Sequence, residues 1–282
     1  MRVLIIDIDS KIPNLALKKI EKYHRDRGDE VEFTPMFEAW ADKIYVSCIF
    51  DWNRPQAEYW AGNPKAVIGG TGWDLTTTLP EEIEAIKPRI NWGFTSRGCI
   101  RNCHFCVVPK KEGKAHPIGD IYDIWDGQSK SLVIMDNNIL ALPDHFKKIC
   151  DQIQKEKIRV DFNQGLDLRL LYANQDLLPA MKKIKHEKYK FSWDLDDDTF
   201  VEKLKMAREN LGVCRIFVIV GFLPWEKIMR KLDILKEMGH DPYIMRHRSV
   251  YQEKRYIQLA RWVNQPAQFK KRTFEQFLEA SN

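Results

Sequence analysis

Short apolar runs alternate with longer amphipathic stretches along most of the chain, which is the pattern of alternating strands and helices. The first run lies within Met1–Ile8 and predicts a buried strand. Asn14 can cap a helix that continues to about Arg27, and Gly28 ends it. Further short strands are expected over Val31–Phe33, Lys43–Phe50 and Lys65–Gly70. Residues 1–88 therefore predict a small α/β segment.

The same alternation continues through residues 89–250. The strands expected there are Ile90–Thr95, Leu132–Met135, Ile158–Phe162, Lys190–Trp193, Cys214–Gly221 and Tyr243–Arg246. Gly212 and Gly239 are expected to end two of the intervening helices. Repeated strand–helix units predict parallel sheets with right-handed crossovers. Residues 251–282 predict one or two further helices that cover the preceding domain.

Composition agrees with a folded protein. Of the 282 residues, 44% are hydrophobic and 11% aromatic, which is enough for a substantial core. No apolar run approaches the length of a membrane span, and the early Asp7 and Asp9 are not typical of a signal peptide, so a cytoplasmic protein without membrane contact is expected. A net charge of +5 leaves a nucleic-acid partner open without favouring it.

Three cysteines stand close together in the segment Gly93–Lys111. Cys99, Cys103 and Cys106 have the spacing C-x3-C-x2-C, and clustered thiolates are the ligands that soft metals and iron–sulfur clusters prefer. Structural zinc usually takes four protein ligands, whereas a cluster held by three cysteines keeps one iron open for chemistry. The other cysteines are scattered in apolar contexts and are expected to be reduced core thiols, namely Cys48, Cys150 and Cys214.

With Phe105 before the last cysteine, the segment resembles the radical SAM superfamily, whose motif is C-x3-C-x-aromatic-C. The resemblance implies a [4Fe–4S] cluster on the three cysteines and S-adenosyl-L-methionine as cofactor, cleaved to a 5′-deoxyadenosyl radical. It also implies a one-electron donor such as flavodoxin or ferredoxin. The α/β fold it implies is a partial (β/α)6 TIM-like barrel over 89–250, with the small segment 1–88 and a helical cover 251–282.

In parallel barrels the site lies at the carboxyl ends of the strands. One strand is followed by Asp136, where the resemblance implies contact with the amino group of the methionine, and an Asx turn is the less favoured alternative. Another leads into Asp167 and Arg169, which could contact the cofactor or form a simple surface pair. The full set of residues expected at the cofactor is Phe105, Asp136, Asn137, Asn138, Gln164, Asp167, Arg169, Trp193 and Gly221.

Substrate contacts are expected from a second set of polar residues. Asp194, Arg246 and His247 also stand at strand ends, although a solvated rim is an equal explanation for the last two. If the N-terminal segment faces the site, it would add Asp7, Asp9 and Lys11.

Several alternatives stay open. A zinc site could be completed by His104 or His116, and the three thiols could simply be buried. Segment 1–88 resembles the remnant of a cobalamin-binding domain, but it lacks the D-x-H-x-x-G motif, so no cobalamin is expected. The G-G-T-G sequence at residues 69–72 could hold a phosphate, but turn glycines are the better interpretation.

The substrate is a separate question. No second cysteine cluster is present in the sequence, which disfavours methylthiotransferase-like chemistry, and a small molecule is favoured over RNA. The chain resembles the queuine lyases, which release a 7-deazaguanine precursor from queuine. A radical SAM enzyme that modifies tRNA is the alternative, and a non-enzymatic iron–sulfur or zinc-binding module is the alternative of a different class.

Overall fold

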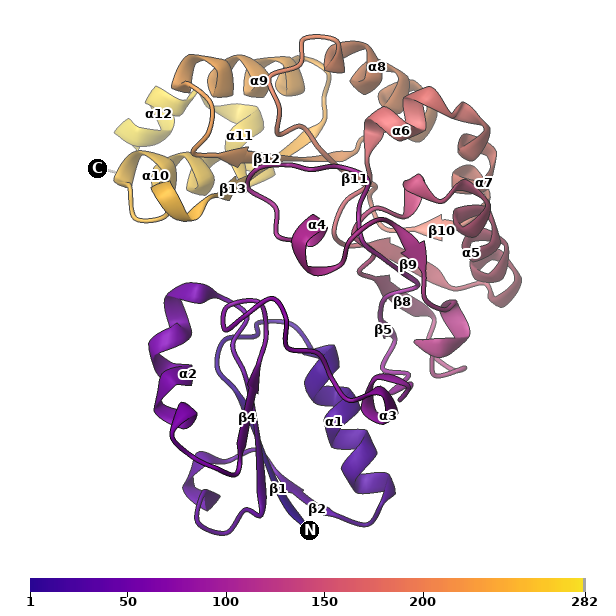
Figure 1. Ribbon diagram of the computed structural model, residues 1–282. Coiled ribbons are helices and arrows are strands. Elements are labelled where there is room, and N and C mark those ends of the chain that lie inside the picture. The colour runs from indigo at the N-terminus through magenta and orange to yellow at the C-terminus, as the bar shows by residue number, and fades with distance from the viewer. Residues whose placement is uncertain (281–282) are drawn as a thin grey trace. The chain divides into compact units, whose positions relative to one another are not determined.

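Parallel sheets and helices form both units of the chain, as a computed structural model that describes residues 1–280 shows (Figure 1). The two units are Met1–Ser129 and Lys130–Asn282, and each is described by itself. The expected α/β class is confirmed, and the described residues contain no closed barrel. The expected domain limits at residues 88 and 250 stay predictions.

A parallel sheet of order β2-β1-β3-β4 is the centre of the first unit. Its strands are β1 (Arg2–Asp7), β2 (Glu30–Glu32), β3 (Lys43–Ser47) and β4 (Ala66–Gly69). They alternate with α1 (Leu15–Asp26), η1 (Pro35–Phe37), η2 (Asp51–Asn53) and α2 (Arg54–Ala61), and α3 (Glu81–Glu84) follows. The strands expected over 1–88 are therefore confirmed: β1, β3 and β4 are shorter than predicted, and β2 is shifted by one residue.

Strand β1 is buried on both faces because successive side chains point to opposite sides of the sheet. Val3 and Ile5 pack with Leu17 and Ile20 of α1. Leu4 and Ile6 belong to a second cluster whose other members are Ala41, Ile44, Val46 and Trp60. The continuous apolar run predicted a buried strand for this reason.

Helix α1 begins as the sequence predicts. The side chain of Asn14 accepts a hydrogen bond from the Leu17 amide at 3.3 Å. The helix ends before Gly28, which has a φ of +79°. His24 lies buried in this helix, where Nδ1 is 2.7 Å from an oxygen of Asp29 and Nε2 is 3.1 Å from the Tyr45 hydroxyl.

The rest of the first unit consists of short elements. They are β5 (Trp92–Gly93), β6 (Ser96–Arg97), α4 (Val108–Lys111), β7 (His116–Pro117) and η3 (Ile121–Asp123). The strand expected over Ile90–Thr95 is only two residues long. Arg89 and Asn91 have positive φ values of 49° and 61°, which an extended strand does not allow.

The second unit places its strands side by side in chain order. They are β8 (Ser131–Ile134), β9 (Arg159–Phe162), β10 (Lys185–His186), β11 (Lys190–Ser192), β12 (Arg215–Val220) and β13 (Asp241–Arg246). Strand β9 pairs in parallel with β8 and β10, and β12 pairs in parallel with β11 and β13. A parallel bridge between Leu166 and Phe191 connects the segment after β9 to β11.

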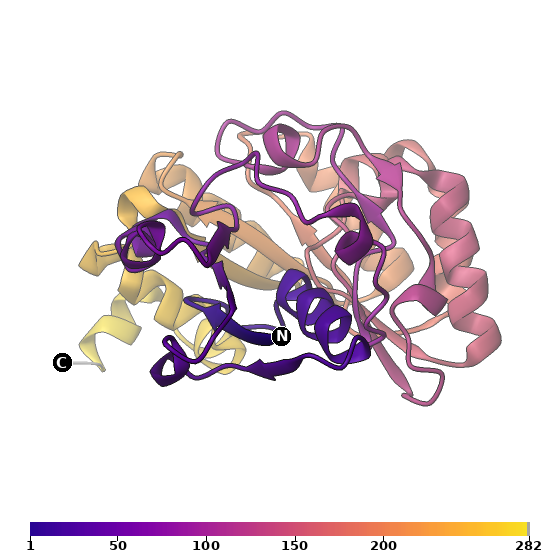
Figure 2. The same ribbon diagram turned by 60° about the horizontal axis from the view of Figure 1, so that its bottom comes forward.

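Helices lie along one face of these strands (Figures 1 and 2). They are α5 (Pro143–Glu156), α6 (Leu168–Ala173), α7 (Leu178–Lys183), α8 (Phe200–Leu211) and α9 (Trp225–Glu237), with the short turns η4 (Ile139–Ala141), η5 (Gln175–Leu177) and η6 (Arg248–Val250). Gly212 and Gly239, with φ values of +76° and +68°, follow α8 and α9 as predicted.

Three helices follow β13, so the expectation of one or two was wrong. They are α10 (Lys254–Val263), α11 (Pro266–Lys271) and α12 (Phe274–Glu279). Pro266 begins α11, and Thr273 forms a capping box with Gln276 that begins α12. The ring of Trp262 lies 5.1 Å from Phe269 and 5.4 Å from Phe274, which joins the three helices through their aromatic side chains.

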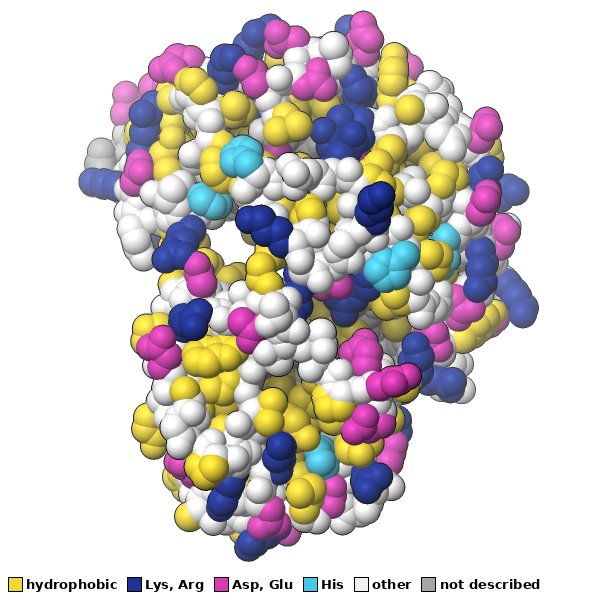
Figure 3. Space-filling view, in the orientation of Figure 1, with side chains coloured by type: hydrophobic (Ala, Val, Ile, Leu, Met, Phe, Trp, Pro, Cys, Tyr) yellow, Lys and Arg dark blue, Asp and Glu magenta, His cyan; other side chains and the backbone are white. Residues whose placement is uncertain are grey.

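Charged and hydrophobic side chains are spread over the face shown in Figure 3. Acidic and basic side chains are interspersed on the face shown in Figure 3, so this face has no large field of one sign. None of the helices in the described part of the chain is both long and apolar enough to cross a membrane.

Candidate functional site

The cysteine motif lies on a loop whose two ends are tied together. Strands β6 and β7 pair in antiparallel register, and the Cys99 amide donates to the Gly113 carbonyl at 3.0 Å. Gly98 has a φ of +81°, and a Cβ at this position would lie 2.7 Å from the carbonyl oxygen of Gly113. The backbone of residues 98–114 therefore closes on itself only because residue 98 has no side chain.

Inside this loop the motif is held by local turns. The Cys106 amide donates to the Cys103 carbonyl at 2.9 Å, and the Arg101 amide donates to the Cys99 sulfur at 3.3 Å. Lys111 ends the short helix α4, and its Nζ donates to the carbonyls of Leu75 and Thr77 at 3.0 and 2.9 Å. The loop is thus anchored to the segment after β4 within the same unit.

Burial separates the six cysteines into two classes. Cys99, Cys103 and Cys106 are half-buried, whereas Cys48, Cys150 and Cys214 are buried. Burial raises the pKa of Cys150 and of Cys214 to about 12, so these two stay protonated and unreactive. The expectation that all three are core thiols is confirmed.

The donor set of the loop fits an iron–sulfur cluster in chemistry. It offers three cysteine sulfurs on one short segment, and the ring of Phe105 lies 5.1 Å from that of His104. Within residues 1–280, no group of three or more His, Cys, Asp or Glu side chains is arranged to hold a metal ion. The cluster ligands, and the alternative zinc site with His104 or His116, accordingly stay predictions.

Asp7, Asp9 and Lys11 follow β1 in the first unit. The carboxylate of Asp9 accepts hydrogen bonds from the amides of Ile49 and Phe50 at 2.8 and 2.9 Å and from Asn53 Nδ2 at 3.1 Å. Asp7 is exposed and accepts from the Ser10 amide, and Lys11 is exposed. The structure therefore gives Asp9 a role in holding the loop after β3, and its role as a substrate ligand stays a prediction.

Replacing Asp9 by alanine is expected to lower the free energy of unfolding by about 2 to 3 kcal/mol, because two backbone amides lose their acceptor. Urea denaturation measures this loss. Asp7→Ala is the matched control, since the Asp7 carboxylate accepts one exposed hydrogen bond, and it should cost less than about 1 kcal/mol. Equal losses in the two variants would contradict this role of Asp9.

The G-G-T-G segment is explained by close backbone packing. Gly70 has a φ of +102°, and a Cβ there would lie 2.8 Å from the carbonyl carbon of Cys48. A Cβ on Gly72 would lie 2.7 Å from the Phe50 amide nitrogen. These glycines let the loop after β4 lie against the loop after β3, which agrees with the turn interpretation.

In the second unit, Asp136 and Asn138 are buried directly after β8, and Asn137 is half-buried between them. Asn138 stands at the start of η4. Cofactor contacts are expected at the carboxyl ends of parallel strands. The position of Asp136, Asn137 and Asn138 after β8 is compatible with such contacts, which stay predictions.

Asp167 and Arg169 form a bidentate pair after β9. Arg169 Nε and Nη2 donate to the two carboxylate oxygens of Asp167 at 2.9 and 3.2 Å. The same carboxylate accepts from the Arg169 amide at 3.1 Å and so caps α6. The Asp167–Arg169 ion pair, which the sequence offered as one alternative, is therefore present. It is not a simple surface pair, because the Asp167 side chain is only 7% exposed. Gln164 is exposed in the preceding turn.

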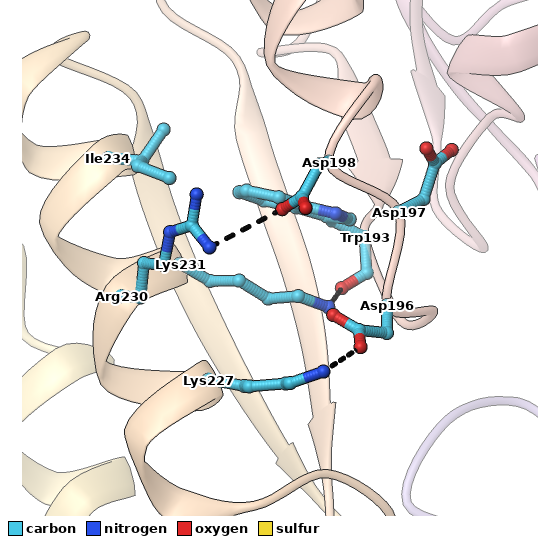
Figure 4. Close-up of a pocket in the computed structure, with 8 residues that line it drawn as sticks. All are labelled: Trp193, Asp196, Asp197, Asp198, Lys227, Arg230, Lys231 and Ile234. Atoms are coloured by element: carbon cyan, nitrogen blue, oxygen red, sulfur yellow. Dashed lines mark hydrogen bonds and ion pairs between the residues drawn. The ribbon is translucent and has the colours of Figure 1, made fainter.

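Trp193 and Asp194 follow β11 and are held from two sides. The Asp194 carboxylate accepts from the Ile219 amide of β12 at 3.0 Å, and burial raises the pKa of this group. Trp193 is buried and stacks on Phe200 at 5.3 Å. Lys231 of α9 donates to the carbonyls of Trp193 and Leu195 at 3.0 and 2.8 Å. Figure 4 shows the contact with Trp193.

In the pocket of Figure 4, acidic and basic lining side chains pair with one another. It is lined by Trp193, Asp196, Asp197, Asp198, Lys227, Arg230, Lys231 and Ile234. Lys227 pairs with Asp196, and Arg230 lies 3.5 Å from Asp198. Asp197 accepts from the Thr199 amide and hydroxyl in the turn before α8.

Because Lys231 is buried, we expect the stability of the protein to depend on pH. Burial lowers the pKa of Lys231 to about 8, so between about pH 8 and 10.5 the unfolded chain binds more protons at this side chain than the folded chain. The Lys231 contribution to stability therefore rises with pH through this window. Lys231→Met has no group that titrates at this position. The free energy of unfolding of wild type should therefore rise relative to that of Lys231→Met by up to about 3 kcal/mol from pH 8 to pH 10.5. Parallel curves of unfolding free energy against pH would contradict it.

Gly221, Arg246 and His247 lie close together at the ends of β12 and β13. Gly221 has a φ of +117°, and a Cβ there would lie 3.2 Å from the His247 Cβ. His247 Nδ1 lies 3.0 Å from the Ser249 hydroxyl, and its ring is 4.3 Å from Phe222. Arg246 donates to the Tyr251 carbonyl and lies over the Tyr251 ring.

The predicted residues thus fall into local groups: the cysteine loop with Phe105, the turn around Asp9, the Asp167–Arg169 pair, the Trp193–Asp194 turn, and the Gly221–His247 corner. Sequence reasoning missed Asp161 and Lys190, whose side chains form an ion pair on the strands β9 and β11. The available signal was a charged residue inside each of two apolar strands, V-D-F and K-F-S.

A comparison of the chain with protein-family models finds no match, and a search of curated proteins finds no significant relative.

Proposed function

We propose that the protein is a radical SAM enzyme. The observation that carries the proposal is the loop at residues 98–114, which is closed at its base and carries Cys99, Cys103 and Cys106 in the spacing C-x3-C-x-aromatic-C. A [4Fe–4S] cluster on these sulfurs would supply the electron that cleaves S-adenosyl-L-methionine to methionine and a 5′-deoxyadenosyl radical. The electron would come from a donor such as flavodoxin or ferredoxin.

The second unit supports the expected barrel type. Its parallel strands follow one another in chain order, with helices along one face, as the later part of a partial (β/α)6 barrel requires. Residues at the strand ends would then orient the cofactor: the buried Asp136 offers an acceptor to an ammonium group, and Trp193 and Gly221 stand at later strand ends. A cytoplasmic location stays a prediction.

Two further polar side chains at strand ends, Arg169 and Asp194, are held in place by hydrogen bonds. Two hydrogen bonds from Asp167 fix the direction of the Arg169 guanidinium. Asp194 is half-buried, and desolvation raises the pKa of its carboxyl group.

A small molecule is the favoured substrate, and the reaction is expected to be a lyase reaction on it. The resemblance to the queuine lyases makes queuine the first compound to test. The experiment is anaerobic reconstitution, followed by measurement of 5′-deoxyadenosine under dithionite with and without queuine. Deoxyadenosine formation supports the radical class, and release of a 7-deazaguanine supports the lyase. No deoxyadenosine in a protein that holds four irons would overturn the proposal.

One observation favours a nucleic-acid substrate as the second candidate. Arg246 lies 4.3 Å from the Tyr251 ring and Arg255 lies 3.6 Å from the Trp225 ring, and within residues 1–280 neither forms an ion pair with a carboxylate. Arginines stacked in this way present their N–H edges to phosphates. This candidate would make the protein a tRNA-modifying radical SAM enzyme.

Fluorescence anisotropy with labelled tRNA at two salt concentrations tests that candidate. It predicts that Arg246→Ala with Arg255→Ala weakens binding and reduces the salt dependence. Arg54→Ala is the matched control, because Arg54 also lies over a tryptophan, 4.8 Å from the Trp73 ring, but is paired with Glu58 at 3.3 Å. No binding by wild-type protein at moderate salt would exclude it.

The alternative of a different class is a non-enzymatic iron–sulfur or zinc-binding module. It predicts bound zinc, or a cluster that does not respond to S-adenosyl-L-methionine.

A further inference from the structure

The cysteine loop exposes the residue that follows each of its three cysteines. Ile100 follows the first cysteine and is 52% exposed, and Val107 follows the last cysteine and is 40% exposed. His104 follows the middle cysteine and is exposed as well. Apolar side chains that are exposed together on one short loop often mark a contact with another molecule. The loop therefore offers apolar surface directly beside the first and last positions of the motif.

The exposed charges of the same loop are all positive. Over residues 97–118, the Lys, Arg, Asp and Glu side chains that are exposed are Lys110 and Lys114. Neither of them pairs with a carboxylate in the part of the chain that the structure describes. The one acidic residue of this stretch, Glu112, is half-buried and lies 3.1 Å from Arg97. The positive charge of the two lysines is therefore not neutralised within the loop.

Backbone hydrogen bonds place each of these lysines near one of the exposed aliphatic residues. The Lys110 amide donates to the Val107 carbonyl at 3.1 Å within the turn that forms α4. The Cys99 amide donates at 3.0 Å to the carbonyl of the residue that precedes Lys114, and Ile100 is the next residue after Cys99. The apolar and the positively charged positions of the loop are thus neighbours in the folded backbone.

We infer that this loop face, formed by Ile100, Val107, Lys110 and Lys114, is the docking surface for an electron-donor protein with an acidic face. An apolar centre with a charged rim is the composition of a protein–protein interface. Lysines on the rim favour a partner of negative charge and speed its association. RNA phosphates would also attract the lysines, but a phosphate backbone does not bury the two aliphatic side chains, so a protein fits the surface better.

The inference rests on the proposed function, because only that function requires an electron donor. In the proposed enzyme one electron would pass from the donor, which is oxidised, to the cluster, which is reduced, and no bond would form or break. Electron transfer between proteins weakens steeply with distance, so the donor has to come close to the sulfur atoms. The loop face meets this requirement, since Ile100 and Val107 are each joined directly to a cysteine of the motif.

Isothermal titration calorimetry of the full chain with an acidic flavodoxin in its oxidised form tests the surface without turnover. Wild-type protein should bind more weakly at high salt, because salt screens exposed charges. The double variant Lys110→Glu/Lys114→Glu should bind at least about ten-fold more weakly than wild type at low salt, since it sets like charges against the partner. Lys183→Glu/Lys185→Glu is the matched control, because both residues are exposed lysines and the change in net charge is the same. No binding by wild type, or equal losses in the two double variants, would overturn the inference.

Formation of 5′-deoxyadenosine gives a second readout. With reduced flavodoxin at low salt, Lys110→Glu/Lys114→Glu should form it at least about ten-fold more slowly than wild type, whereas dithionite, a small reductant, should drive both proteins equally. An equal loss with both reductants would show damage to the loop itself and contradict the inference.

The two readouts separate this inference from the proposed function. If wild-type protein forms no deoxyadenosine with either reductant, the proposed function fails, and calorimetry with oxidised flavodoxin still decides whether the loop face is a docking surface. A double variant Lys110→Glu/Lys114→Glu that loses tRNA binding but keeps flavodoxin binding would assign the loop face to RNA and overturn the inference.

Discussion

Cys103→Ala is expected to lose both the bound iron and the formation of 5′-deoxyadenosine. In the proposed enzyme the middle cysteine of the motif would supply one of three sulfur ligands, so its loss would leave two, and two thiolates do not hold a four-iron cluster. Iron content after anaerobic reconstitution should fall from about four per chain to a small fraction of that value. Deoxyadenosine should fall to the background of the assay.

Cys150→Ala provides the control. Cys150 is buried in α5, and the variant should keep its iron and its deoxyadenosine while losing about 1 to 2 kcal/mol of stability through the lost packing. If Cys103→Ala kept four irons, or if Cys150→Ala lost them equally, the assignment of the cluster to the loop would be wrong.

Gly98→Ala is expected to disrupt the cysteine loop. At a φ of +81° an added side chain carries left-handed strain, and its Cβ would also overlap the backbone at Gly113 and Lys114. Together these effects should cost at least about 3 kcal/mol, because backbone on both sides must move. The variant should also bind much less iron than wild type, since the base of the loop can no longer close. Urea denaturation and iron analysis measure the two effects.

Gly113→Ala separates strain from overlap. Gly113 lies on the same loop with a φ of +71°, but a Cβ there would meet nothing within 4 Å. This variant should lose only about 1 to 2 kcal/mol and keep its iron. Similar behaviour of the two glycine variants would show that the closed base of the loop is not what positions the cysteines.

The elements that sequence analysis predicted well are those with strong local signals. The apolar run of β1 and the cap at Asn14 were found because both are determined by neighbouring residues. The strand expected over Ile90–Thr95 was overestimated, since the positive φ values of Arg89 and Asn91 have no signal in residue type. The third C-terminal helix was missed even though Pro266 and Thr273 are recognisable helix starts.

The candidate site was harder to predict because its contacts join residues far apart in sequence. Asp9 could be recognised as polar, but not as the acceptor for amides at residues 49 and 50. The ion pair between Asp161 and Lys190 spans two strands and depends on their register, which sequence alone does not provide. The cysteine spacing was different, since its chemistry is contained in eight consecutive residues.

Electron paramagnetic resonance of the reduced, reconstituted protein with and without S-adenosyl-L-methionine tests the central claim most directly. A [4Fe–4S] cluster held by three cysteines has one iron open to the cofactor, so the account predicts a signal whose g values shift when S-adenosyl-L-methionine is added. Bound zinc with no signal, or a cluster signal that the cofactor leaves unchanged, would contradict it and favour a binding module.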